Sequence, residues 1–142
     1  MNLVVDASVA SKWFFPEPGA DEADALLGAD DALLAPDLIV AEVVNVAWKR
    51  VRAGEVTWEQ AAAAAEGIGG LLDELVPMAT LAARSLDIAR GLGHPAYDCF
   101  YIALAERFSS HVVTSDDVLL RRVAGTPWAR HVRRLGSRNA RQ

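Results

Sequence analysis

Strand-like and helix-like stretches alternate along the chain. The strand-like stretches are short and rich in apolar residues, and they cover residues 3–5, 32–35, 75–78 and 111–115, with a further candidate at 131–135. The helix-like stretches cover residues 7–15, 20–29, 37–54, 58–74, 81–90, 96–108 and 116–125. Strands that alternate with helices in this way predict an α/β fold, a sandwich around a parallel sheet.

Proline, glycine and capping residues support these boundaries. A turn at Pro16–Gly19 ends the first helix, and Gly54 closes the long third one after a basic last turn. Thr57 has the position of a helix cap, with Glu59 and Gln60 at or near capping-box distance. The proline in the stretch LVPM places that strand at an edge or makes it end there.

The composition indicates one globular domain that covers residues 1–142, of which 52% are apolar. No apolar run approaches the ~18 to 20 residues that a membrane span needs, and the N-terminus lacks a signal-peptide pattern. The single cysteine, Cys99, excludes an intrachain disulfide, and three widely separated histidines argue against a zinc site. We therefore expect a cytoplasmic protein that does not bind a membrane.

Charge is distributed unevenly along the chain. All 19 acidic residues lie at or before Asp117, whereas seven of the 14 basic residues, all arginines, lie between Arg121 and Arg141. The sequence thus predicts an acidic body with an Arg-rich C-terminal end over about residues 121–142. Such an end is either a solvated tail or a contact for phosphates or an acidic partner.

Two aspartates follow predicted strands, where α/β proteins place their ligand sites. Asp6 comes directly after the first strand, and Asp116 follows the fourth. Parallel α/β sheets bind ligands beyond the carboxyl ends of their strands. Each aspartate alone is also explained as the N-cap of the next helix.

Two further acids lie in helices that otherwise look buried. Glu42 is surrounded by apolar residues in DLIVAEVVNVAW, and Asp98 begins an apolar helical stripe in PAYDCFYIALAERF. Each has an ordinary explanation, an exposed acid for Glu42 and an acid in the first helical turn for Asp98. However, a buried carboxylate is costly unless it is paired or binds a metal.

If these four carboxylates converge, they need cations between them. Two like charges about 4 Å apart repel by about 4 kcal/mol at an effective dielectric near 20. No lysine occurs after Lys49, and the arginines gather near the C-terminus. Hard divalent cations such as Mg²⁺ or Mn²⁺ are therefore the natural partners, and they commonly serve phosphodiester cleavage.

Four stretches occur in this order: VVDASV, PDLIVAEVVNVAWK, YDCFYIALAE and VVTSDDVLL. Together they resemble the four motifs of PIN-domain ribonucleases, above all the VapC toxins of bacterial and archaeal toxin–antitoxin pairs. The resemblance covers essentially the whole chain, and the ordered set is specific although each motif alone is weak. It implies a PIN-like three-layer α/β/α sandwich with a central, mainly parallel sheet.

The resemblance also implies roles for individual residues. The catalytic and metal-binding acids would be Asp6, Glu42, Asp98 and Asp116. Polar residues at supporting positions of the family pattern are Ser8, Asn45 and Thr114. Asp117 is an extra acid beside Asp116, and the family order favours Asp116 because it follows Thr114 and Ser115. Cys99 is interpreted as a packing residue.

The function implied by the resemblance is that of a Mg²⁺-dependent endoribonuclease toxin, with Mn²⁺ as a substitute ion, that hydrolyses RNA phosphodiester bonds. A VapB-like antitoxin that blocks the site and a homodimer are implied as well. The largely apolar stretch KWFF at residues 12–15 and the helix around Trp48 are candidate docking surfaces. By analogy, a structured RNA such as a transfer RNA is expected as the substrate.

Other functions fit the sequence less well. A receiver-type signalling domain would need a late lysine, and a dinucleotide-binding enzyme would need a glycine-rich turn after the first strand, which VVDASVAS lacks. The remaining alternative is a PIN-fold RNA- or protein-binding module without significant nuclease activity.

Overall fold

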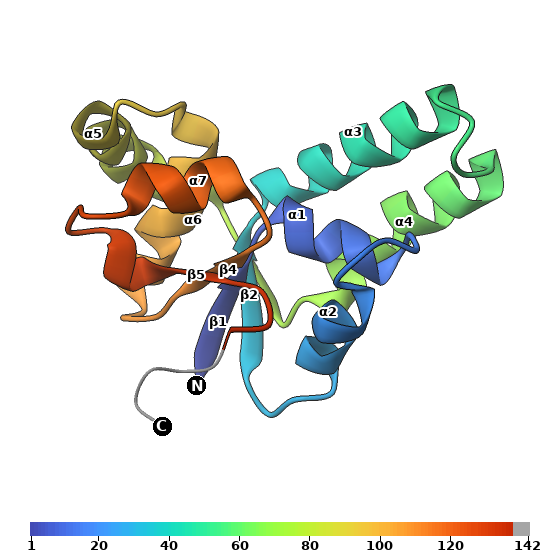
Figure 1. Cartoon of the computed structure of the whole chain (residues 1–142), viewed down its shortest axis with the longest axis horizontal. Helices are drawn as coiled ribbons and strands as arrows, with labels where there is room; N and C mark the ends of the chain where they lie inside the picture. Colours follow the sequence, from blue (N-terminus) through green and yellow to red (C-terminus); the bar gives the residue numbers. More distant parts are fainter. Residues whose placement is uncertain (138–142) are drawn as a thin grey trace.

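A five-stranded sheet forms the centre of the molecule (Figure 1) in this computed structural model, which describes residues 1–137. The strands are β1 (Asn2–Val5), β2 (Ala32–Pro36), β3 (Glu74–Val76), β4 (Val112–Thr114) and β5 (Val132–Arg134). Their order is β3-β2-β1-β4-β5, and each neighbouring pair is parallel. The α/β class and the parallel sheet are confirmed, and β3 lies at an edge as its following proline suggested.

Helices cover both sides of this sheet. They are α1 (Ala7–Ala10), α2 (Ala20–Leu27), α3 (Leu38–Arg52), α4 (Trp58–Leu71), α5 (Ala82–Leu92), α6 (Ala96–Arg107) and α7 (Asp117–Val123). In Figure 1, α5 and α6 lie to the left of the sheet and α2, α3 and α4 to its right. The arrangement is the three-layer α/β/α sandwich expected from the sequence. In residues 1–137, no helix is long and apolar enough to cross a membrane.

Some boundaries and surfaces differ from the sequence interpretation. The helix expected over residues 7–15 is α-helical only to Ala10 and continues as a 3₁₀ turn over Ser11–Trp13. β2 extends to Pro36, one residue beyond the expected strand, and α3 begins at Leu38. Trp48, on the helix that the sequence suggests as a candidate docking surface, is 49% exposed on α3. Two arginines of the expected C-terminal end, Arg138 and Arg141, lie outside the described residues.

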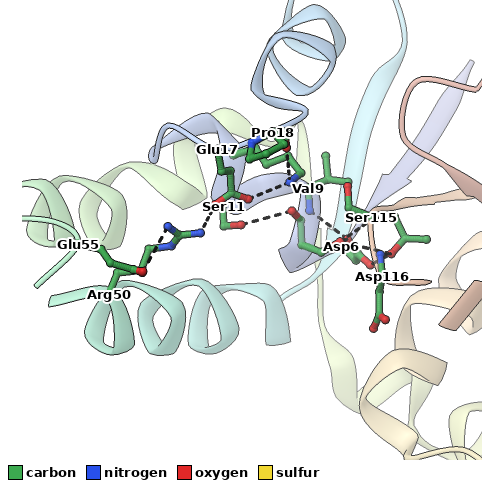
Figure 2. A network of polar contacts seen from close by, with 12 residues as sticks. Asp6, Val9, Ser11, Glu17, Pro18, Arg50, Glu55, Ser115 and Asp116 are labelled. Atoms are coloured by element: carbon green, nitrogen blue, oxygen red, sulfur yellow. Dashed lines mark hydrogen bonds and ion pairs between the residues drawn. The ribbon is translucent and has the colours of Figure 1, made fainter. Parts of the chain in front are cut away.

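A polar network fixes the segment after α1 on α3 (Figure 2). The carboxylate of Glu17 accepts a hydrogen bond from Nζ of Lys12 at 2.9 Å and also binds the guanidinium of Arg50. That guanidinium lies 5.3 Å from the centre of the Phe15 ring, which is buried. These contacts hold α3 against the chain that follows β1, and thereby help to place Glu42 relative to Asp6.

The sheet order creates a switch point between β1 and β4. From β1 the chain continues to β2 and β3 on one side, whereas β4 and β5 lie on the other. Helices leave adjacent strands in opposite directions at such a point and open a crevice beyond the carboxyl ends. Asp6 follows β1 and Asp116 follows β4, so the fold brings both chain positions to this crevice.

Candidate functional site at the β1–β4 switch point

Asp6 is a buried carboxylate with three hydrogen-bond donors. Only 5% of its surface is exposed. Oδ1 accepts from the hydroxyl of Ser8 at 2.6 Å and from the backbone N–H of Val9 at 3.2 Å, while Oδ2 accepts from the hydroxyl of Thr114. Asp6 is therefore the N-cap of α1 and at the same time the residue that β1 delivers to the switch point.

Burial raises the pKa of Asp6 from its ordinary value of 3.8 to about 6. The hydrogen bonds from Ser8, Thr114 and Val9 oppose this rise, and the negative charge of Asp98 adds to it. A carboxylate that is costly to ionise, and that another carboxylate repels, lacks a cation nearby. The site is thus electrostatically prepared to bind positive charge.

Two hydroxyl groups connect the ends of β1 and β4. The backbone N–H of Ser115 donates to Oγ of Ser8 at 2.9 Å, and that of Asp116 donates to Oγ1 of Thr114 at 3.0 Å. Figure 2 shows Asp6, Ser115 and Asp116 in this part of the network. Ser8 and Thr114, for which the sequence predicts supporting roles, thus link Asp6 to the segment that follows β4.

Glu42 lies on the second turn of α3 and is partly buried. Its Oε1 accepts a hydrogen bond from the hydroxyl of Tyr101 on α6, which is 1% exposed. Burial raises the pKa of Glu42, the hydroxyl of Tyr101 opposes this, and the charge of Asp98 adds to it. Burial raises the pKa of Tyr101 most, and the negative charges of Glu42, Asp6 and Asp98 raise it further. The hydroxyl therefore stays protonated and can donate to Glu42.

Asp98 lies in the first turn of α6 and has a histidine as its partner. Nε2 of His94 is 2.6 Å from Oδ2 of Asp98, and the side chain of the histidine is 6% exposed. The charge of Asp98 raises the pKa of both Asp6 and Glu42. Asp98 therefore interacts electrostatically with two of the other predicted acids, Asp6 and Glu42.

Asp116 follows β4 near these acids, but its carboxylate caps a helix. Oδ1 of Asp116 accepts hydrogen bonds from the N–H groups of Val118 and Leu119, at 2.9 and 3.3 Å, and so caps α7. The extra acid Asp117 forms an exposed ion pair with Arg134, with 2.6 Å between oxygen and nitrogen. Asp116 is thus linked to Thr114 through its backbone N–H, and in residues 1–137 no donor bonds to its second carboxylate oxygen.

The two remaining residues of the sequence interpretation lie nearby. Asn45 is exposed on α3, one turn after Glu42. Cys99 is fully buried beside Asp98, its thiol donates to the carbonyl of Pro95, and burial raises its pKa from 9.0 to about 11. The thiol is therefore kept protonated, as a packing residue requires.

The donor set fits a hard divalent cation that keeps some of its water. Within residues 1–137, no three Asp, Glu, His or Cys side chains lie at the spacing that would hold a metal ion by themselves. Mg²⁺ commonly binds one or two carboxylates together with waters and substrate phosphates. Asp6 and Asp98 supply such carboxylates, and in the described part of the chain neither they nor Glu42 pair with lysine or arginine.

Two residues of this site were missed by sequence reasoning. His94 entered only as one of three histidines too far apart for a zinc site, and Tyr101 only as part of the apolar stripe after Asp98. His94 precedes Asp98 by four positions and Tyr101 follows it by three, but only Tyr101 shares α6 with Asp98, so helical spacing could have indicated Tyr101 alone. The contact between Tyr101 and Glu42 joins two helices and leaves no such signal.

Comparison with known proteins agrees with this architecture. Residues 3–126 match the family model described as PIN domain. Ribonuclease VapC3 of Pyrobaculum aerophilum is 30% identical over 118 residues, which are 82% of this chain and 90% of that protein. The crystal structure of PAE2754 from Pyrobaculum aerophilum superposes with a TM-score of 0.66 and 26% identity, over 89% of this chain and 82% of the other. FitAcB from Neisseria gonorrhoeae, at a TM-score of 0.50 and 21% identity over 94% of this chain and 96% of the other, shares the fold.

Proposed function

The chain belongs to the PIN domain family, and on this premise we propose that it is a metal-dependent endoribonuclease, the toxin of a VapBC-type pair. The observation that carries the proposal is the buried carboxylate of Asp6 at the switch point, whose pKa is raised by burial and by the charge of Asp98. The similarity to a protein named Ribonuclease VapC3 supports RNA as the substrate.

The proposed cofactor is Mg²⁺ or, in its place, Mn²⁺. Asp6 and Asp98 would hold the principal ion, and Asp116 and Glu42 would complete the site directly or through waters. When bound, the cation would offset the negative charge of the phosphodiester and lower the pKa of the attacking water. The resemblance to PIN-domain ribonucleases implies cleavage products with 5′-phosphate and 3′-hydroxyl ends.

The protein's own groups prepare the site for in-line attack. Ser8, Thr114 and the N–H of Val9 hold the carboxylate of Asp6 in one orientation and favour its charged form, as hydrogen bonds to a carboxylate do. The hydroxyl of Tyr101 occupies Oε1 of Glu42. Oε2 of Glu42 then remains to accept a proton or a hydrogen bond from the attacking water.

The proposed partners are a VapB-like antitoxin and a second copy of the chain. Support for a protein partner comes from an apolar groove between α3 and α4, whose lining includes Val44, Ala47, Trp48, Trp58, Ala61 and Ala65. The side chains of Trp48 and Trp58 are 49% and 68% exposed. An amphipathic helix of an antitoxin would bury such a groove. A structured RNA such as a transfer RNA is the proposed substrate.

A PIN-fold binding module is the second candidate, because no three described side chains form a complete metal site on their own. Cleavage of a mixed RNA substrate with Mn²⁺ distinguishes the two. The wild-type protein should cleave, and Asp98→Asn should lose cleavage while its circular dichroism spectrum stays unchanged, since the amide keeps the shape and loses the charge. Equal turnover of both proteins at saturating Mn²⁺ would refute the assignment of Asp98, and binding of RNA without any cleavage by wild type would favour the binding module.

A further inference from the structure

His94 enters the site because the connection between α5 and α6 is short and sharply turned. Gly93 ends α5 with a φ of 63°, in the left-handed region, and the N–H of His94 bonds back to the carbonyl of Ala89. Pro95 then precedes α6 with a φ of −53°, which the proline ring favours. Gly93 and Pro95 are exposed at this turn, whereas the side chain of His94 is only 6% exposed.

The buried imidazole contacts only one of the two oxygens of Asp98. Nε2 lies 2.6 Å from Oδ2, and the carboxylate of Asp98 remains 27% exposed. In the described residues, no protein donor bonds to Oδ1 of Asp98. One oxygen is therefore anchored to the protein, and the other remains for a ligand.

Asp98 needs such an anchor because its neighbours repel it. Its charge raises the pKa of both Asp6 and Glu42, so Asp98 and each of these two carboxylates repel one another. An aspartate that is partly exposed could relieve this repulsion by rotating into solvent. A hydrogen bond from a buried ring opposes that rotation, because the ring itself has little freedom to follow.

We propose that His94 is a positioning residue that holds Asp98 through Oδ2 and directs Oδ1 toward the cation and RNA phosphate. This inference rests on the proposed function, since Asp98 acts there as a ligand. His94 touches neither the cation nor the RNA in this arrangement and acts only through Asp98. Groups that orient metal ligands in this way are commonly worth about 10- to 100-fold in metal affinity or activity.

Two substitutions separate the hydrogen bond from packing. His94→Phe keeps a ring of similar size in the buried space and removes the donor. His94→Gln restores a donor, because its amide nitrogen is the same number of bonds from Cβ as Nε2 of histidine. His94→Asn places its amide nitrogen one bond closer to Cβ and so falls short of Asp98; it replaces the Phe variant if that protein does not fold.

The experiment measures Mn²⁺ affinity by isothermal titration without RNA, and kcat and KM for RNA cleavage at saturating Mn²⁺. His94→Phe should weaken Mn²⁺ binding by about 10- to 100-fold and lower kcat with little change in KM, whereas His94→Gln should recover most of both. Unchanged Mn²⁺ affinity and kcat in His94→Phe, or a Gln variant no better than the Phe variant, would overturn the role of His94. A wild-type protein that neither binds Mn²⁺ nor cleaves RNA would overturn the proposed function as well, so the two failures are distinguishable.

Discussion

Replacing the carboxylate of Asp6 by an amide should stabilise the protein when no metal is present. The pKa of Asp6 is raised from 3.8 to about 6, mainly by burial. One pKa unit corresponds to 1.36 kcal/mol, so ionised Asp6 costs the native state about 3 kcal/mol at pH 7. The side chain is 5% exposed, so solvent screening reduces this figure little.

The gain expected for Asp6→Asn is smaller than the full cost of the charge. The amide oxygen can still accept from Ser8 and Val9, but the amide nitrogen faces the hydroxyl of Thr114, which must turn and accept instead of donating. Loss of one hydrogen bond to a charged group offsets about 1.5 to 3 kcal/mol at most. We expect a net gain of up to about 1.5 kcal/mol, or up to ~5 °C in Tm for a domain of this size.

The dependence on pH has a definite sign. A carboxylate whose folded pKa is raised binds more protons in the native state than in the unfolded chain between about pH 4 and 6. The contribution of Asp6 therefore destabilises the protein fully above pH 6 and is relieved as the pH falls toward 4. The advantage of Asp6→Asn over the wild type should accordingly shrink over this range.

Thermal melts from pH 4.5 to 8, in chelator and in Mn²⁺, measure these effects. Asp24→Asn is the matched control, because it removes the same charge from the exposed face of α2 and so reports the effect of net charge alone. Mn²⁺ should stabilise the wild type and the control far more than Asp6→Asn, since binding to the native state adds stability by mass action. If Asp6→Asn melts below the wild type in chelator at pH 7, or gains as much from Mn²⁺, Asp6 does not contribute a strained carboxylate to a metal site.

Three further predictions concern other parts of the molecule. Tyr101→Phe removes the hydroxyl that lowers the pKa of Glu42, so the acid limb of the pH–rate profile should move to higher pH. Cleavage at pH 7 should fall about 10-fold. An unshifted profile would contradict the role of this hydrogen bond. Arg121 and Arg122 are both exposed on α7, and we expect their replacement by alanine to weaken the salt dependence of binding to single-stranded RNA. The slope of log affinity against log salt should become smaller by about 0.7 for each phosphate that the protein no longer neutralises. A slope equal to that of the wild type would exclude α7 from the RNA-binding surface. Cys99, with its pKa raised to about 11, should react with iodoacetamide at pH 8 only after denaturation, and fast labelling of the native protein would show that the thiol is not buried as described.

The layers of the fold and the chain positions of the acids follow from local sequence patterns. Alternating strand and helix patterns are local signals, because burial of a strand or of one helix face is written into consecutive residues. The same is true of the capping box, in which Thr57 and Gln60 exchange hydrogen bonds across one helical turn. That Asp6 follows a strand and that Asp98 begins an apolar helix could likewise be read directly from the residues around them.

Which of these acids act on one another depends on how distant parts of the chain pack. The order β3-β2-β1-β4-β5 makes β4 the neighbour of β1, although more than a hundred residues separate Val5 from Val113 with which it pairs. Asp6 thereby meets Thr114, and the packing of α6 against the sheet adds Asp98 to the same region.

Tertiary packing also assigns the partners that hold the site together. The bond from Tyr101 to Glu42 joins two helices, and the buried contact of His94 with Asp98 depends on the turn at Gly93. Asp116 and Asp117 are neighbours in sequence, yet one caps α7 and the other pairs with Arg134. Such differences arise because the direction of a side chain depends on the backbone and on elements from distant parts of the chain, and a local sequence pattern contains neither.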